Sequence, residues 1–382
     1  MGAPGYLAAS VPPRMASAGA AVALPLAAVE QVGDVAVGGL LVAASLGPSV
    51  LAAPLAGTAL DRAARPGALI AGAGLLTAGS FVAAAFLGQV PLPLVFVMLV
   101  VAGAVSPFYL GGLSSFVAGA IPDSRRAFAY DALSYNVSAV AGPALVAAIA
   151  AFLPARAALA VLALAAVAGA LAVGILKLRP HGRSAGSPWQ AITSGLRRIF
   201  GHRPLAVVTA SSTFTQLGQG GLAVAAIALS IERIGSPAEG AAVVTSFAVG
   251  SLAGALYETA RPTRRQPHWV MLAGFLATGG LTVMAAIDLG MVWAVILIGL
   301  SGVFTAPTAA AMLFLRNQHS PAPLKSQIFT VSAGFRASAS AAGAALAASA
   351  AGLGGAGLVI AMGSIWIVSG LMMAAYPKNA GS

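Results

Sequence analysis

Long apolar runs fill the chain from end to end, and each is separated from the next by a few polar or helix-breaking residues. A membrane-spanning α-helix needs about 20 apolar residues, because each residue adds 1.5 Å and the hydrocarbon core is about 30 Å thick. The runs end at breakers such as Gly33-Asp34, Pro122-Asp123 and Ser236-Pro237. The pattern predicts twelve spans, near 7–31, 34–56, 67–88, 92–118, 127–152, 156–176, 204–230, 240–257, 268–287, 290–315, 327–350 and 354–376.

Composition supports a polytopic membrane protein over a soluble one. Of the 382 residues, 59% are hydrophobic and 8% are charged, and the mean hydropathy is +0.93. Soluble domains are only about 45–50% apolar. The absence of cysteine excludes disulfides and thiol chemistry. A signal peptide is the rival interpretation of the first run, but no small-residue cleavage motif follows it.

Charge predicts the orientation. With the N-terminus in the cytoplasm, most of the 20 Lys and Arg residues fall in inner loops, whereas the outer loops hold only Arg156 and Arg233. The inner set includes Arg125, Arg197, Arg198, Arg265, Arg316 and Lys325. This asymmetry follows the positive-inside rule and predicts an integral protein of a bacterial inner membrane with both termini in the cytoplasm. The net charge of +11 is therefore a topology signal, not a sign of nucleic-acid binding.

One long inner segment, residues 177–203, is rich in Arg, Gly, Ser and Pro. It predicts a linker between an N-terminal six-helix half, 1–176, and a C-terminal half, 204–382. The halves look duplicated, because P-L-A-G-T-A-L-D at 54–61 returns about 200 residues later as S-L-A-G-A-L-Y-E at 251–258. The expected fold is therefore an all-α membrane protein with two pseudo-symmetric halves. Transporters with such parallel repeats bind substrate near the midplane between the repeats.

A short charged segment, G-T-A-L-D-R-A-A-R, separates the second and third spans. It resembles the G-x-L-a-D-R-x-G-R loop signature of the major facilitator superfamily, through Gly57, Leu60, Asp61, Arg62 and Arg65. It departs from the signature at Ala64, Pro66 and Gly67. Twelve spans, a basic middle segment and the half-repeat agree with that superfamily over essentially the whole chain.

Two further motifs bear on exporter branches of the superfamily. A-V-A-G-P-A-L at 139–145, with Gly142 and Pro143, is similar to the Gly-Pro motif of their fifth helix, although the trailing Gly pair is missing. The preceding R-A-F-A-Y-D-A-L run also resembles drug and metabolite exporters. The arginine that exporters carry in the fourth helix, where it is associated with proton coupling, is absent from 92–118.

The loop signature implies a conformational latch made of Gly57, Asp61, Arg62, Arg65 and Asp131. We expect the Asp61 carboxylate to face the positive end of a neighbouring helix, where it gains roughly 0.3–1 kcal/mol. Arg65 would pair with Asp123 or Asp131. The alternative is a positive-inside loop with no switching role. A structural ion pair is also an alternative to a proton-carrying role for Asp131.

Ionisable residues inside spans are costly and usually functional. Arg336 lies about ten residues into the eleventh span, on a stripe with Ser332, Ser340 and Gly343. We expect it to bind an anionic or polar group of the substrate, or to pair with a coupling acid; snorkelling or a structural pair is the alternative. The other substrate or coupling candidates are Tyr135, Gln216, Gln219, Tyr109, Thr305, Glu30 and Asp34. For Glu30 the alternative is a solvated loop acid.

Enzyme signatures are lacking. The 4 histidines fall in or beside predicted inner loops without an acid at metal-ligand spacing, and there is no G-x-x-x-x-G-K-S/T loop for ATP. We therefore predict a monomeric secondary transporter with no cofactor or metal, working by alternating access in the lipid bilayer. The exporter-like motifs imply proton-driven efflux of a small drug or metabolite. The alternatives are an uptake permease or uniporter of the same fold, or a non-transporting regulatory membrane protein.

Overall fold

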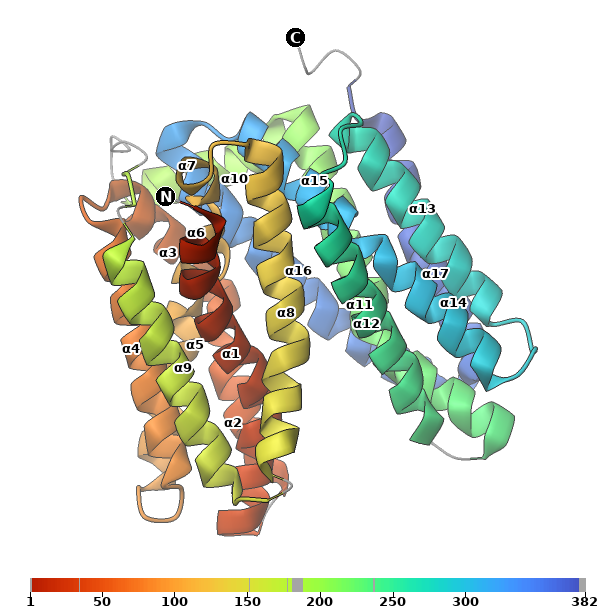
Figure 1. Ribbon diagram of the computed structural model, residues 1–382, viewed down its shortest axis with the longest axis horizontal. Coiled ribbons are helices and arrows are strands. Elements are labelled where there is room, and N and C mark those ends of the chain that lie inside the picture. Colours follow the sequence, from red (N-terminus) through yellow and green to blue (C-terminus); the bar gives the residue numbers. More distant parts are fainter. Residues whose placement is uncertain are drawn as a thin grey trace. The chain divides into compact units, whose positions relative to one another are not determined.

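The computed structural model describes residues 2–33, 35–150, 152–176, 178–180, 188–235 and 238–377. In this part of the chain the regular structure is helical, and the only β-type pairing is an isolated bridge between Leu87 and Val90. Eleven helical segments are long and apolar enough to cross a membrane. The 25-residue helix α16 (Lys325–Ser349) coincides with the eleventh predicted span and is also long enough. The predicted all-α class is confirmed (Figure 1).

The helices before the linker are α1 (Ala3–Val32), α2 (Val35–Leu46), α3 (Pro48–Arg62), α4 (Pro66–Ala85), α5 (Leu92–Val105), α6 (Gly111–Ser114), α7 (Val117–Ala120), α8 (Ser124–Ala150) and α9 (Ala155–Ile175). The later helices are α10 (Pro188–Gly201), α11 (Arg203–Ile234), α12 (Ala238–Ala260), α13 (Pro267–Ala285), α14 (Met291–Val303), α15 (Thr305–His319), α16 and α17 (Gly354–Met372). Short 3₁₀ turns occur at Ser106–Phe108, Ala322–Leu324, Ala351–Leu353 and Met373–Ala375.

The chain forms two compact units. Unit 1 comprises Met1–Asp123, Val137–Gly195 and Pro321–Gly334, and unit 2 comprises Ser124–Asn136, Leu196–Ser320 and Phe335–Ser382. Helix α8 therefore belongs to unit 2 up to Asn136 and to unit 1 beyond it, and α16 changes from unit 1 to unit 2 after Gly334. The units differ from the predicted halves mainly by the exchange of these two helix beginnings.

The same helix neighbours recur in the two units. In unit 1, α9 packs against α1 and α4, and in unit 2, α17 packs against α11 and α13. Figure 1 shows α9 running alongside α1 and α4. The helices of each set have the same order along their half of the chain, so the packing agrees with the duplication seen in the sequence.

The outer surfaces of both units are apolar. Leu51 and Ile175 in unit 1 are 84% and 80% exposed, and Val292 in unit 2 is 73% exposed. Apolar patches of this kind are rare on soluble monomers. Lipid chains are the solvent that such side chains require.

One expectation about a helix end needs correction. The second span was expected to end at residue 56, but α3 continues through Asp61 and Arg62, so both residues lie in a helical last turn. The predicted linker, 177–203, contains the helix α10 (Pro188–Gly201). The amphipathic sequence of α10 is consistent with this helix: Ile199 is fully buried while Arg197 is exposed.

Close helix contacts in unit 2 depend on glycine. A Cβ atom placed on Gly279 of α13 would lie 2.5 Å from the carbonyl oxygen of Gly363 on α17, whereas one on the adjacent Gly280 would meet nothing within 4 Å. Membrane helices associate through such small residues, because they allow two backbones to approach.

We therefore predict opposite effects for two neighbouring substitutions. Gly279→Ala should lower the melting temperature, because overpacking costs roughly 1–3 kcal/mol. Gly280→Ala should leave it unchanged or raise it, because alanine favours the helix by about 0.5–1 kcal/mol. The melting temperature can be followed by intrinsic fluorescence, since the chain has 4 tryptophans and no cysteine for thiol dyes. Equal melting temperatures for the two variants would contradict the close α13–α17 contact.

Candidate functional site

Asp61 binds the amino end of α16. Its carboxylate is only 2% exposed. Oδ1 accepts a hydrogen bond from the Ser326 backbone N–H at 2.8 Å, and Oδ2 accepts one from the Gln327 N–H at 3.0 Å. The first N–H groups of a helix have no partner within the helix and form its positive end. Asp61 thus satisfies two such groups with a full negative charge.

Gly57 makes this contact possible. It lies one turn before Asp61 on α3, and a Cβ at this position would overlap the Cα of Gln327. The glycine and the acid of the loop signature therefore act on the same turn of α16. Nearby, the Ser115 and Ser326 hydroxyls are hydrogen-bonded at 3.0 Å.

The other predicted latch residues differ in position. Arg62 follows Asp61 directly and is half-buried at the end of α3, whereas Arg65 is exposed and precedes α4. Among the described residues Arg65 makes no ion pair, so the expected pairing with Asp123 or Asp131 is not found there. Asp131 is fully buried in the part of α8 that belongs to unit 2, whereas Asp61 and Arg65 belong to unit 1. The physical reason is that this part of α8 packs through Ala129 and Ala132 onto α15.

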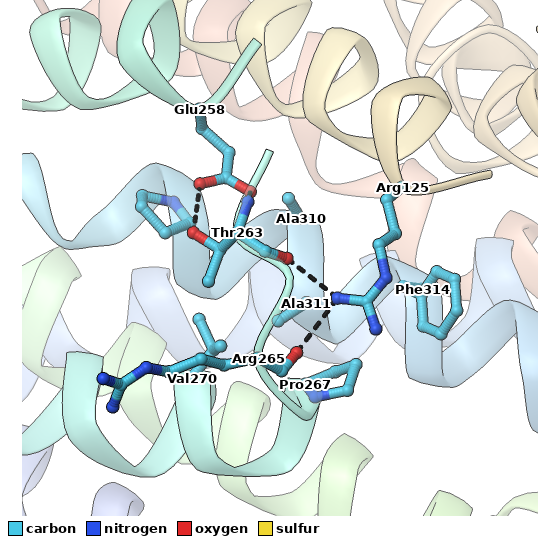
Figure 2. Close-up of a pocket in the computed structure, with 10 residues that line it drawn as sticks. Arg125, Glu258, Thr263, Arg265, Pro267, Val270, Ala310, Ala311 and Phe314 are labelled. Atoms are coloured by element: carbon cyan, nitrogen blue, oxygen red, sulfur yellow. Dashed lines mark hydrogen bonds between the residues drawn. The ribbon is translucent and has the colours of Figure 1, made fainter. Parts of the chain in front are cut away.

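Unit 2 has a related contact around the loop after α12 (Figure 2). Glu258, the repeat counterpart of Asp61, accepts hydrogen bonds from the Thr263 N–H at 2.8 Å and from the Thr263 hydroxyl at 2.7 Å. Arg125, in the first turn of α8, donates to the carbonyl oxygens of Thr263 at 2.8 Å and Arg265 at 2.9 Å. Its guanidinium lies 5.3 Å from the ring centre of Phe314, a cation–π distance.

The two contacts are similar. In unit 1, Asp61 at the end of α3 binds the first turn of α16 directly. In unit 2, Glu258 near the end of α12 binds Thr263, whose carbonyl oxygen accepts a hydrogen bond from Arg125 in the first turn of α8. Sequence reasoning missed Arg125, which was counted only as an inner-loop charge. The available signal was the half-repeat, which aligns the first turn of α8 with the first turn of α16.

Tyr109 belongs to a polar cluster in unit 1. Its hydroxyl lies 3.0 Å from the Ser17 hydroxyl and 3.4 Å from the Thr77 hydroxyl. Arg14 of α1 is buried and donates to the carbonyl oxygen of Leu110 at 3.1 Å and to the Ser114 hydroxyl at 2.9 Å. A pocket adjoins this cluster and is lined in part by Ser17, Ser45, Thr77, Phe81, Ser106 and Tyr109.

The polar residues of unit 2 that were predicted to contact substrate differ in exposure: Thr305 is part-buried, and the Gln216–Gln219 pair is exposed. Thr305 lies between helices, with its hydroxyl 2.7 Å from that of Ser251 and 2.6 Å from the carbonyl oxygen of Gly302. Gln216 donates to the Gln219 side chain at 2.8 Å, and this pair is exposed. The carboxamide pair is therefore more exposed than Thr305.

Arg316 corrects another expectation. It was assigned to an inner loop, but it is 2% exposed on α15 and its Nη2 lies 3.5 Å from the Ser212 hydroxyl of α11. Arg336 is half-buried on α16, as expected for a residue within a span.

The two predicted stripes on α8 and α16 are partly helix interfaces. Ser138 donates to the Val11 carbonyl oxygen at 3.1 Å, and a Cβ on Gly142 would lie 2.5 Å from the Met15 carbonyl oxygen, so this part of α8, which also holds the half-buried Pro143, packs on α1. On α16, Gly343 lies directly against the backbone of Leu217 on α11. Small residues on these stripes therefore serve close packing.

Glu30 caps a helix. Its Oε2 accepts a hydrogen bond from the Ala155 N–H, the first residue of α9, at 2.7 Å. Its repeat counterpart Glu232 accepts from the Gly355 and Ala356 N–H groups at the start of α17. Glu30 is exposed, as a solvated loop acid would be, and it also supplies an acceptor that the first N–H groups of α9 need. Asp34 lies outside the described residues.

Three histidines gather near one end of unit 2. The His319 Nε2 lies 2.6 Å from the Tyr376 hydroxyl, the His202 and His319 ring centres are 5.2 Å apart, and His268 stacks on Tyr376. Burial, reinforced by the Arg198 charge, lowers the pKa of His202. No group of three His, Asp or Glu side chains in the described part of the chain has a metal-binding arrangement.

We predict that Asp61→Asn exposes the first turn of α16. The variant loses the charge and one acceptor at the helix end, a cost of about 1–3 kcal/mol. Amide hydrogen exchange at Ser326 and Gln327 should accelerate, while exchange at Gly355 and Ala356, held by Glu232, should not change. Unchanged exchange at Ser326 and Gln327 would show that Asp61 does not hold this turn.

Comparison with known proteins adds the family. The sequence profile of the Major Facilitator Superfamily matches residues 9–344. No curated protein sequence matches the chain.

Solved transporters have similar folds. The fucose:proton symporter FucP of E. coli is 16% identical with a TM-score of 0.72, covering 98% of this chain and 99% of that chain. A bacterial homologue of the iron transporter ferroportin in an outward-facing state is 16% identical with a TM-score of 0.77, covering 98% of each chain. The proton:xylose symporter XylE is 12% identical with a TM-score of 0.72, covering 99% of this chain and 97% of that chain.

Sequence identities of 12% to 16% show a similarity of fold alone. The profile match covers most of the length of this chain and includes the residues around Asp61 and Arg125 that organise the two helix-end contacts. The chain therefore belongs to the Major Facilitator Superfamily.

Proposed function

We propose that this protein is a secondary active transporter that works by alternating access and exports a small organic molecule, a drug or metabolite, in exchange for protons. Family membership supports a carrier over an enzyme. The exporter-like Gly142-Pro143 motif supports efflux. We further propose that it acts as a monomer in a bacterial inner membrane, with both termini in the cytoplasm.

The observation that carries the proposal is the bond between Asp61 and the first turn of α16. Helix α16 begins in unit 1 and continues in unit 2, so a contact at its amino end acts on a helix that both units share. Alternating access requires contacts that form in one state and break in the other. Two charge-assisted hydrogen bonds are worth a few kcal/mol, enough to favour one state without trapping it.

Arg125 supplies the corresponding contact for α8, the other helix that both units share. The candidate latch thus comprises Gly57, Asp61 and Arg62 near α16, together with Arg125 near α8. We propose Tyr109, within unit 1, and Tyr135, Arg336 and the Gln216–Gln219 pair, within unit 2, as separate candidates for contact with the substrate.

Inside-out membrane vesicles test transport and its coupling. Acidifying the vesicle interior with ATP should drive accumulation of an exported probe, and we would measure ethidium as a cationic probe and fluorescein as an anionic one. An uncoupler should abolish accumulation of the probe that is a substrate. Uptake of the probe that is the same with and without the uncoupler would contradict proton antiport and favour a uniporter. Accumulation only in right-side-out vesicles would favour an uptake permease, and no protein-dependent movement would favour a non-transporting protein.

Asp61→Asn should slow this transport by roughly tenfold or more, because about 1–3 kcal/mol is removed from one of the two states. The matched control is Asp288→Asn, which removes an acid whose side chain is 79% exposed and which pairs with Arg233 at 3.3 Å. The control should transport normally. Wild-type rates in Asp61→Asn would remove the latch from the mechanism.

A further inference from the structure

A pocket in unit 1 lies among three chain segments, each of which adjoins a membrane span. Its volume is about 320 Å³, the size of a small-molecule site. The segments are 115–120, which follows the fourth span and includes α7, 178–180, which follows α9, and 322–325, which leads into α16. All of them belong to unit 1, so the pocket lies within one compact unit.

Two of the side chains that line this pocket are basic, Arg179 and Lys325, and none is acidic. Arg179 is exposed and makes no ion pair with another described residue, and Lys325 is half-buried. Asp61 is bound next to Lys325, where its two carboxylate oxygens accept hydrogen bonds from the Ser326 and Gln327 N–H groups. The lining therefore presents positive charge to a ligand and has no acid of its own.

The rest of the lining is mostly apolar. Phe116 is 4% exposed, and Ala118 and Leu178 are half-buried. Gly119 also lines the pocket, and a Cβ atom placed on it would meet nothing within 4 Å. Apolar walls contribute to binding only when a ligand covers them with apolar surface. The ligand that fits this pocket therefore carries both an anionic group and hydrocarbon.

The position of the pocket in the membrane indicates which ligand this is. The charge pattern assigns all three segments to the cytoplasmic side, at the ends of spans, and lipid head groups lie at this level. Basic pockets between membrane helices on that side bind the head groups of anionic lipids. Arginine is suited to phosphate because its guanidinium donates two parallel N–H···O bonds, and lysine adds a compact charge.

We infer that Arg179 and Lys325 form a binding site for the phosphate group of an anionic phospholipid, whose hydrocarbon covers the apolar lining around Phe116. A free phosphate ester has the same ionic chemistry but no surface to place against that lining. The inference goes beyond the proposed export function and does not depend on it, because it concerns the binding of lipid and not the movement of a solute.

Native mass spectrometry of the purified full-length protein in detergent measures the affinity for added lipid. The probes are dioleoyl phosphatidylglycerol, which is anionic, dioleoyl phosphatidylcholine, which has the same chains and no net charge, and glycerol 3-phosphate, which has no chains. Phosphatidylglycerol should bind roughly tenfold or more tightly than phosphatidylcholine, because two basic side chains favour the net negative head group. Equal affinities for the two lipids would overturn the inference. Glycerol 3-phosphate that binds as tightly as phosphatidylglycerol would overturn the assignment to a lipid.

Arg179→Gln removes one of the two charges. It should weaken phosphatidylglycerol binding roughly fivefold, the contribution of one basic residue near a membrane surface. Its melting temperature without lipid should not change, because Arg179 is exposed. The matched control is Arg156→Gln, which removes an exposed arginine of unit 1 that does not line the pocket. Equal losses of affinity in the two variants would indicate unspecific charge attraction and overturn the inference.

Gly119→Leu tests the pocket without changing any charge. The leucine side chain should fill part of the pocket and weaken phosphatidylglycerol binding, while its Cβ meets no clash that would unfold the protein. Gly72→Leu on α4 is the control, because a Cβ at Gly72 also meets nothing within 4 Å and this glycine does not line the pocket. The control should bind phosphatidylglycerol like the wild type. Full affinity in both Arg179→Gln and Gly119→Leu would show that the lipid binds elsewhere and overturn the inference.

Discussion

A carboxylate placed at the amino end of a helix is the interaction on which much of this structure depends. Hydrocarbon offers no acceptor for the first N–H groups of a helix, so these groups must be satisfied within the protein. Asp61 does this for α16, Glu30 for α9 and Glu232 for α17. The chain has only 9 Asp and Glu residues, and three of them accept hydrogen bonds from the first N–H groups of a helix. Stabilising these helix starts therefore offsets the free energy of placing a carboxylate there.

Because the two halves of the chain are duplicated, carboxylates that accept backbone hydrogen bonds occur at corresponding positions in both halves. Glu30 and Glu232 hold corresponding helices, and Asp61 and Glu258 occupy corresponding ends of α3 and α12. The beginnings of α8 and α16 are exchanged between the two compact units, and each is held by polar contacts at its first turn. Helices shared in this way are suited to carry a change in one unit into the other, which alternating access requires.

The arginines of unit 2 lie in different settings. Arg125, at a helix end, donates to backbone carbonyl oxygens. Arg316 is 2% exposed within a candidate membrane span, and its Nη2 lies 3.5 Å from the Ser212 hydroxyl. Ionisable side chains inside spans are costly and usually functional.

The sequence by itself determined the helical class, the membrane spans and the family, because hydropathy and the Gly57–Arg65 signature are local properties of the chain. The resemblance to the loop signature also led us to expect that Asp61 faces the positive end of a neighbouring helix. Only the tertiary structure decided which helix that is, because Ser326 is far from Asp61 along the chain. For the same reason the sequence misassigned Arg316 to a loop and did not reveal that Glu30 contacts the start of α9: spacing tells which residues share a helix face, but burial and partners depend on the helix that packs against that face.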